Sequence, residues 1–86
     1  MFEFDPAKSA ANKAKHGIDF VEAQALWDDQ RVLELGIVMY EREERRLYVG
    51  DIDGCRWTAV VTHRDGHIRI ISVRRARARE EMAYDG

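Results

Sequence analysis

Small apolar residues recur at helical spacing near the start of the chain. Asp5 followed by Pro6 suits a helix start, because aspartate caps free backbone N–H groups and proline is tolerated in the first turn. Gly17 suits a helix end, where the backbone enters the left-handed region. The stripe that would face the core has the spacing i, i+3, i+4, i+7 and consists of Ala7, Ala10, Ala11 and Ala14. We therefore expect a helix from Pro6 to His16.

A second helix is indicated directly after the first. Asp19 and Glu22 have the spacing of a capping box, in which each side chain bonds the backbone N–H of the other residue. Apolar residues continue through Trp27, and Asp28-Asp29 then interrupts the pattern. The two N-terminal helices should form a tight pair with a very short connection.

The pattern changes to that of strands after residue 30. Asp53-Gly54 and Asp65-Gly66 are strong signals for two-residue hairpin turns. The expected strands, rich in β-branched and aromatic residues, cover residues 31–40 (with a bend or bulge at Gly36), 46–51, 56–64 and 68–75. The last segment, residues 76–84, is rich in Ala, Arg, Glu and Met and indicates a C-terminal helix.

These elements predict an α+β fold in a single domain that spans residues 1–86. Two N-terminal helices should pack on a four-stranded antiparallel meander sheet that is followed by the C-terminal helix. Phe2 and Phe4 alternate with Glu3, which fits either a short strand or an extended lead-in.

The turn at Asp65-Gly66 determines which side chains share a face of the sheet, because side chains alternate along a strand. One face then carries Arg64, Arg69 and Arg75. Arg74 falls on the other face, beside Trp57. A one-residue bulge would exchange these faces.

Composition narrows the class of protein. The chain has 86 residues, 45% of them hydrophobic, and its longest uninterrupted apolar run is four residues, Ile37 to Tyr40, so no transmembrane helix is expected. The start of the chain lacks the pattern of a signal peptide. Cys55 is the only cysteine, which rules out an internal disulfide and fits the reducing cytoplasm.

The net charge of −2 hides an uneven distribution. Residues 1–55 carry seven basic and twelve acidic side chains, whereas residues 56–79 carry seven arginines against one acid, Asp65. The mildly acidic total argues against a nucleic-acid binder, but a local cluster of arginines attracts polyanions whatever the net charge. The alternative is that these arginines are ordinary solvent-exposed side chains at strand ends and on a helix face.

Two stretches of the sequence carry a more specific signal. The first is Phe4-Asp5, Lys8, Asn12, Lys15-His16-Gly17-Ile18, Phe20 and Glu22-Ala23. The second is Val60-Val61-Thr62, Arg64, Arg69-Ile70-Ile71-Ser72, Arg74-Arg75-Ala76, Arg79-Glu80 and Tyr84. Together they resemble the BrnT toxin family over nearly the whole chain, with residues 30–57 matching least well.

The resemblance implies a RelE-like fold and a ribonuclease toxin of a type II toxin–antitoxin pair. It also implies that the toxin inhibits translation, and that a BrnA-like ribbon-helix-helix antitoxin neutralises it in a heterotetramer of two toxins and two antitoxins. Such a complex would bind operator DNA through the antitoxin alone.

A metal-independent ribonuclease needs cations to stabilise a crowded phosphate, together with an acid and a base that move protons. Arg64 lies in the Thr-x-Arg stretch that resembles the family and Arg74 in its Ser-x-Arg stretch, so both are candidates for catalysis. The alternative for Arg74 is a structural role, paired with Glu80 or stacked on Trp57.

The remaining candidates are weaker. Catalysis could also use His16 as a base and Tyr84 as an acid, although His16 could equally cap a helix end and Tyr84 could pack in the core. The candidates for RNA binding are Arg69, Arg75, Lys8 and Lys15.

No cofactor and no metal are expected. His63, His67 and Cys55 lack the spacing of a zinc site, and no glycine-rich phosphate loop is present. The alternative to a ribonuclease is a catalytically silent module, which only binds an antitoxin and takes part in promoter autoregulation.

Overall fold

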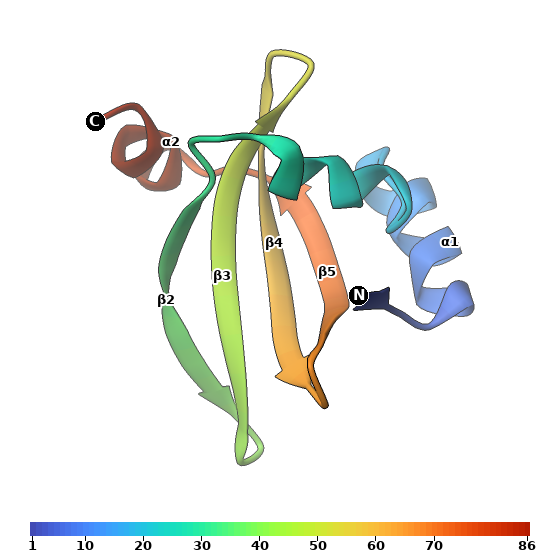
Figure 1. Cartoon of the computed structure of the whole chain (residues 1–86). Coiled ribbons are helices and arrows are strands. Elements are labelled where there is room, and N and C mark those ends of the chain that lie inside the picture. Colours follow the sequence, from blue (N-terminus) through green and yellow to red (C-terminus); the bar gives the residue numbers. More distant parts are fainter.

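Four long strands form consecutive hairpins in the computed structural model, which describes residues 1–86 (Figure 1). They are β2 (Leu33–Tyr40), β3 (Glu43–Ile52), β4 (Cys55–Arg64) and β5 (His67–Arg75). The turns at Asp53-Gly54 and Asp65-Gly66 are confirmed, and in both the two turn residues have positive φ. A third turn of the same kind, at Glu41 and Arg42, joins β2 to β3.

A fifth strand corrects the predicted sheet. β1 (Phe2–Glu3) pairs in parallel with β5, with Phe2 opposite Ile68, and the strand order is β1-β5-β4-β3-β2. The sheet is therefore five-stranded and mixed, and the expectation of a four-stranded antiparallel meander was wrong. Two residues are too short to show a strand period, and no local turn signals a pairing across more than sixty residues.

The first helix, α1 (Pro6–His16), begins and ends as predicted, but the expected core-facing stripe was wrong. Its buried residues are Ser9 and Asn12, and the alanines of the stripe are exposed. The Asp5 side chain accepts a hydrogen bond from the Ala7 N–H at 2.8 Å. Gly17, at φ 85°, donates its N–H to the Lys13 carbonyl at 2.9 Å.

The predicted second α-helix is instead a 3₁₀-helix, η1 (Glu22–Asp28). The capping box is present, since the Glu22 N–H bonds the Asp19 carboxylate at 2.7 Å and the Asp19 N–H bonds the Glu22 carboxylate at 2.9 Å. Ala23 and Leu26 are both fully buried. Their spacing of three puts both side chains on one face of the 3₁₀-helix, where residues i and i+3 are aligned.

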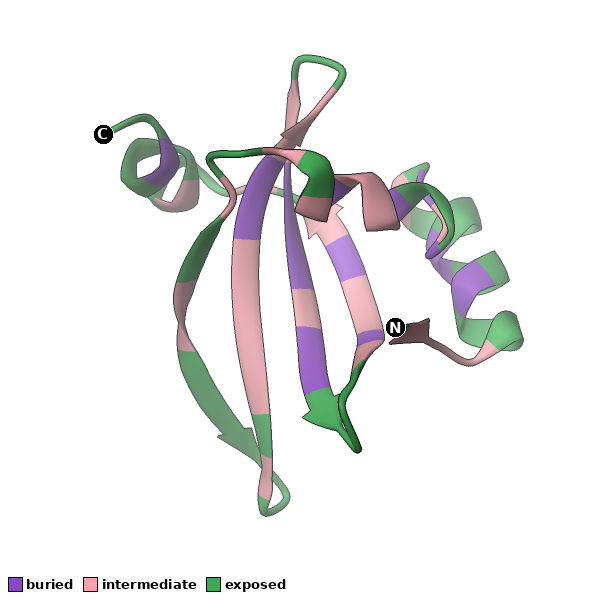
Figure 2. Ribbon diagram, viewed as in Figure 1, coloured by how far each residue is buried: buried purple, intermediate pink, exposed green.

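One face of the sheet, here called the inner face, packs against α1 and η1 and holds the core (Figure 2). Asn12 connects α1 to β5. Its side-chain amide donates a hydrogen bond to the Val73 carbonyl at 2.9 Å and accepts one from the Val73 N–H at 3.2 Å. The buried apolar cluster comprises Ile18, Phe20, Ala23, Leu26, Trp57, Ala59, Val61, Ile70 and Val73.

A bulge in β5 corrects the predicted faces of the last strand. Val60 lies opposite Ser72 and Val61 opposite Ile70, so Ile71 is the extra residue. Beyond it, Arg74 turns to the face opposite the core and Arg75 turns to the inner face. The prediction that Arg74 lies beside Trp57 was therefore wrong, and Arg75 takes that place.

The opposite face, here called the outer face, is covered only at one end. There α2 (Ala78–Asp85) contacts β2 and β3, and the Glu80 side chain accepts a hydrogen bond from Thr58 at 2.8 Å. None of the helices has the length and apolar content to cross a membrane.

Candidate functional site

Three of the candidate arginines share the outer face. The register places Arg64 and Arg69 towards the β4–β5 turn, and Arg74 near α2. Arg64 and Arg74 are six positions apart along β4, since Arg74 lies opposite Thr58, which corresponds to about 20 Å. The two residues therefore cannot act on the same phosphate, although both can line the path of one RNA strand.

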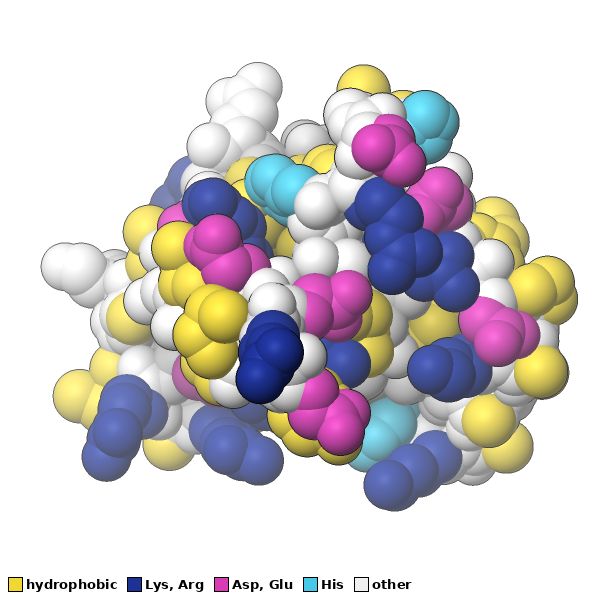
Figure 3. All heavy atoms as spheres, turned by 90° about the horizontal axis from the view of Figure 1, so that it is seen from below, with side chains coloured by type: hydrophobic (Ala, Val, Ile, Leu, Met, Phe, Trp, Pro, Cys, Tyr) yellow, Lys and Arg dark blue, Asp and Glu magenta, His cyan; other side chains and the backbone are white.

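Each of these arginines lies near a carboxylate. Arg64 Nη2 is 3.5 Å from Glu43, and Arg69 Nη1 is 3.4 Å from Glu3. Viewed from the end of the sheet that carries the β2–β3 turn, basic and acidic side chains are interleaved (Figure 3). These two contacts are longer than strong charge-assisted hydrogen bonds of about 2.7–2.9 Å, so the guanidinium groups remain available to another anion.

Arg74 is held differently. Its two terminal nitrogens donate to the two oxygens of Glu80 at 2.7 and 2.9 Å. The hydrogen bond from Arg74, together with hydrogen bonds from the Arg77 N–H and Thr58, lowers the pKa of Glu80 to about 2 despite burial of the carboxyl. Pairing with Glu80 was one of the two structural roles considered for Arg74, and it anchors the start of α2 to the sheet.

Tyr84 is also engaged in packing. Its hydroxyl donates to Asp29 Oδ2 at 2.6 Å, and that hydrogen bond raises the pKa of the phenol. The guanidinium carbons of Arg31 and Arg56 lie 5.0 and 4.9 Å from the ring centre. Tyr84 therefore ties the end of α2 to the segment after η1.

The other candidates do not join the outer face. Lys8, Lys15 and His16 lie on α1, which packs against the inner side of β5. The Arg75 guanidinium lies 5.3 Å from the centre of the Trp57 ring on the inner face. Of the eight candidates, only Arg64, Arg69 and Arg74 project from strands onto the outer face.

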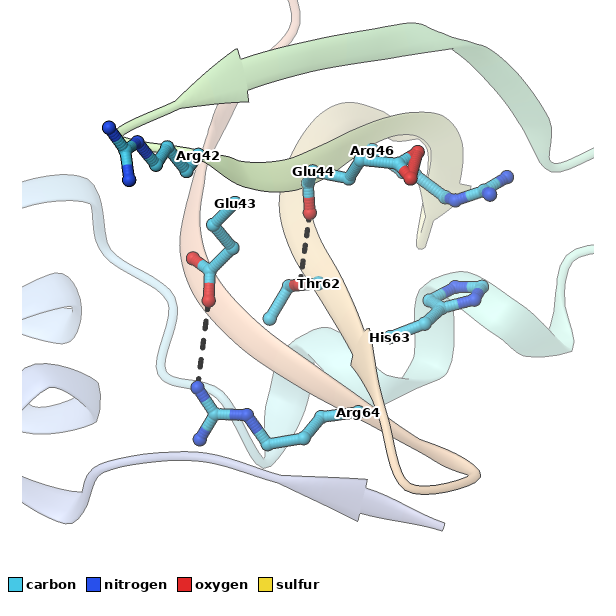
Figure 4. Close-up of a pocket in the computed structure, with 7 residues that line it drawn as sticks. All are labelled: Arg42, Glu43, Glu44, Arg46, Thr62, His63 and Arg64. Atoms are coloured by element: carbon cyan, nitrogen blue, oxygen red, sulfur yellow. Dashed lines mark hydrogen bonds and ion pairs between the residues drawn. The ribbon is translucent and has the colours of Figure 1, made fainter.

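A cavity of about 450 Å³ lies at the end of the sheet that α2 leaves open (Figure 4). It forms because β3 and β4 separate beyond the pair Arg46 and Val61. In the gap, the Thr62 hydroxyl donates to the Glu44 carbonyl at 2.9 Å. The lining contains no hydrophobic residue and consists of Arg42, Glu43, Glu44, Arg46, Thr62, His63 and Arg64.

The sequence analysis did not single out Arg42 and Glu43, because residues 41–45 fall outside the predicted strands, nor Arg46, which begins the predicted strand 46–51. The available signal was a charged segment, residues 41–46, that follows directly on the apolar run Ile37 to Tyr40. A two-residue turn at Glu41-Arg42 would have predicted that Glu43 lies near Arg64.

The fold and this surface define a class: a small α+β domain whose sheet presents arginine side chains to anionic ligands. The sequence matches the family described as the ribonuclease toxin BrnT of type II toxin–antitoxin systems over residues 4–80. The chain belongs to this family, and the resemblance inferred from the two motifs is confirmed. A comparison with curated proteins gives no match.

Proposed function

We propose that this protein is the toxin of a type II toxin–antitoxin pair and cleaves RNA without a metal ion, which inhibits translation in the cytoplasm. Membership of a ribonuclease toxin family supports the reaction class. The observation that carries the proposal is the set of loosely paired arginines, Arg64 and Arg69, on the open half of the outer face.

The reaction is a transesterification. The 2′-hydroxyl loses its proton and attacks the adjacent phosphorus, and the bond from phosphorus to the 5′-oxygen breaks as that oxygen gains a proton. Negative charge builds on the phosphate oxygens in the transition state, where fixed guanidinium donors stabilise it. Arg64 and Arg69 supply such donors, whereas Arg74 positions α2 and the end of β5 through Glu80.

Cleavage of a labelled RNA in the presence of a chelator tests this proposal. We expect the double variant Arg64→Ala, Arg69→Ala to lose at least about a hundredfold in rate, as is typical when oxyanion donors are removed. Arg79→Ala, which removes an exposed cation from α2, is the matched control and should cleave normally. Normal cleavage by the double variant, with its fold intact, would contradict the assignment.

The partner that we propose is a BrnA-like ribbon-helix-helix antitoxin, bound as two toxins and two antitoxins. It would silence the toxin by covering the outer face and would stabilise it by mass action. Co-expression of an adjacent short reading frame should relieve growth arrest, and the mass of the purified complex should correspond to a heterotetramer.

A silent interaction module is the second candidate. It is favoured by the structural engagement of Arg74 and Tyr84, two groups that catalysis was expected to use. This reading predicts tight antitoxin binding and no RNA cleavage by the isolated chain, so the chelator assay separates the two functions.

A further inference from the structure

The cavity between β3 and β4 combines Arg64 with two further charged residues, Arg42 and Glu43. In Figure 4, Arg42, Glu43 and Arg64 lie on one side of the two strands, while Arg46 and His63 point to the other. Glu43 and Arg64 belong to the outer face, because side chains alternate along β3 and β4. Arg42 lies in the turn before β3, on the same side as these two residues. The outer side of the cavity is therefore continuous with the surface that carries Arg69.

Glu43 occupies the middle of this group. Its two carboxylate oxygens lie 3.4 Å from Arg45 Nε and 3.5 Å from Arg64 Nη2. By comparison, the Arg74–Glu80 pair closes to 2.7 Å. Two guanidinium groups thus converge on one anion that fits neither well, and half of the Arg64 side chain remains exposed.

Arg42 is the third cation, and the structure gives it no hydrogen bond or ion pair. It sits in a strained turn, since Glu41 has φ 48° and Arg42 has φ 69°. A turn with positive φ at both positions favours Asn-Gly, and other residues there carry a conformational cost. Strain of this kind concentrates at functional sites, and here the strained residue lines the cavity.

We infer that the outer side of this cavity is a binding subsite for one phosphodiester of the RNA, which displaces the Glu43 carboxylate and is held by Arg42 and Arg64. This inference rests on the proposed ribonuclease function and adds the position of the substrate strand. Glu43 competes with the RNA for the same arginines. Without RNA, the Glu43 carboxylate pairs with Arg64, and in the complex the phosphodiester takes the place of that carboxylate.

A phosphate suits the subsite better than a carboxylate of a partner protein. The planar forks of arginine match phosphate oxygens, and a tetrahedral phosphodiester offers acceptors in more directions than a planar carboxylate. The resident carboxylate already shows a poor fit, because both of its contacts are long.

Binding of a fluorescent 2′-O-methyl oligoribonucleotide tests the inference separately from cleavage, because this probe has no free 2′-hydroxyl to attack the phosphate. We expect Arg42→Gly and Arg64→Ala each to weaken binding about tenfold and to reduce the slope of log affinity against log salt by about 0.7. Arg42→Gly should fold at least as well as the natural chain, because glycine suits a positive φ. Glu43→Gln should tighten binding severalfold.

Two controls on α2 match these charge changes. Arg79→Ala and Glu81→Gln alter exposed side chains at the covered end of the sheet, and each should change affinity less than its counterpart. Equal effects of Glu43→Gln and Glu81→Gln, or unchanged binding by Arg42→Gly, would overturn the inference. So would competition by polyglutamate as strong as that by the unlabelled oligonucleotide, since that result would assign the subsite to an acidic protein.

The inference and the proposed function fail differently. If the natural chain cleaves RNA while the cavity variants bind the probe normally, only the subsite is rejected. If the chain never cleaves RNA and binding still depends on Arg42 and Arg64, only the ribonuclease function is rejected.

Discussion

At the scale of single residues, the partners of a charged side chain decide its role. Arg74 and Arg64 occupy similar motifs in the sequence, but Arg74 forms two short hydrogen bonds to Glu80 and has 20% of its side chain exposed. Arg64 has one long contact and 52% of its side chain exposed. The first is suited to holding structure together, and the second to meeting a ligand.

The Glu80 contacts predict a pH dependence of stability. Because the pKa of Glu80 is about 2 in the folded chain, against an ordinary value of 4.5, the stabilising contribution is complete above about pH 4.5. It is lost as the pH falls from 4.5 towards 2, with an upper limit of about 3 kcal/mol. Urea unfolding of the natural chain and of Glu80→Gln at pH 7 and at pH 3 should show a smaller difference between them at pH 3. An equal difference at both pH values would show that the carboxylate charge is not what α2 requires.

At the scale of elements, the sequence predicted the capped ends of α1 and two of the hairpin turns, because their signals are local. The caps of α1, the capping box before η1 and the turns at Asp53-Gly54 and Asp65-Gly66 all depend on residues a few positions apart, and all are present. The bulge at Ile71 has no such signal, since isoleucine is an ordinary strand residue. Because that bulge decides which arginines share a face, the candidate site could be predicted only in part.

The pairing of β1 with β5 was missed for a related reason. Hydrophobic alternation over Phe2 to Phe4 left a strand possible, but nothing nearby specified its partner. Long-range pairing depends on the finished sheet having an open edge at β5, which only the assembled fold reveals.

The Glu41-Arg42 turn predicts that a substitution which stabilises the fold will weaken RNA binding. Replacing it by Asn-Gly should stabilise the β2–β3 hairpin by about 1 kcal/mol, since both residues then suit a positive φ. The same change removes Arg42 and should weaken oligonucleotide binding. Thermal unfolding and probe binding of one purified variant measure both effects. A variant that is less stable than the natural chain would show that the turn is not strained.

At the scale of the whole molecule, α2 covers one half of the outer face and leaves the other half open. α2 closes the first half through Glu80 and Tyr84, and the separated ends of β3 and β4 define the second. Next to the open half, the edge strand β2 exposes apolar side chains at Ile37, Val38, Met39 and Tyr40. An open apolar edge strand favours association with other chains.

This edge predicts the behaviour of the isolated protein. Met39 is 60% exposed, so Met39→Lys introduces a charge at the edge strand without disturbing the core. We expect this variant to reduce the concentration-dependent self-association of the protein. Light scattering over a range of protein concentrations measures the change. Association that is equal in the natural chain and in Met39→Lys would place the contact elsewhere on the surface.

The parallel pairing of β1 with β5 affects the order in which the chain can complete itself during synthesis. Phe2 pairs with Ile68, and Asn12 of α1 bonds Val73, so β1 and α1 can complete these contacts only after β5 has been synthesised. Helices and hairpins can form early, but long-range pairings of this kind close late. The bulge that turns Arg74 outward lies in that same final strand, so the newly made chain acquires its arginine-lined face only when β5 has emerged.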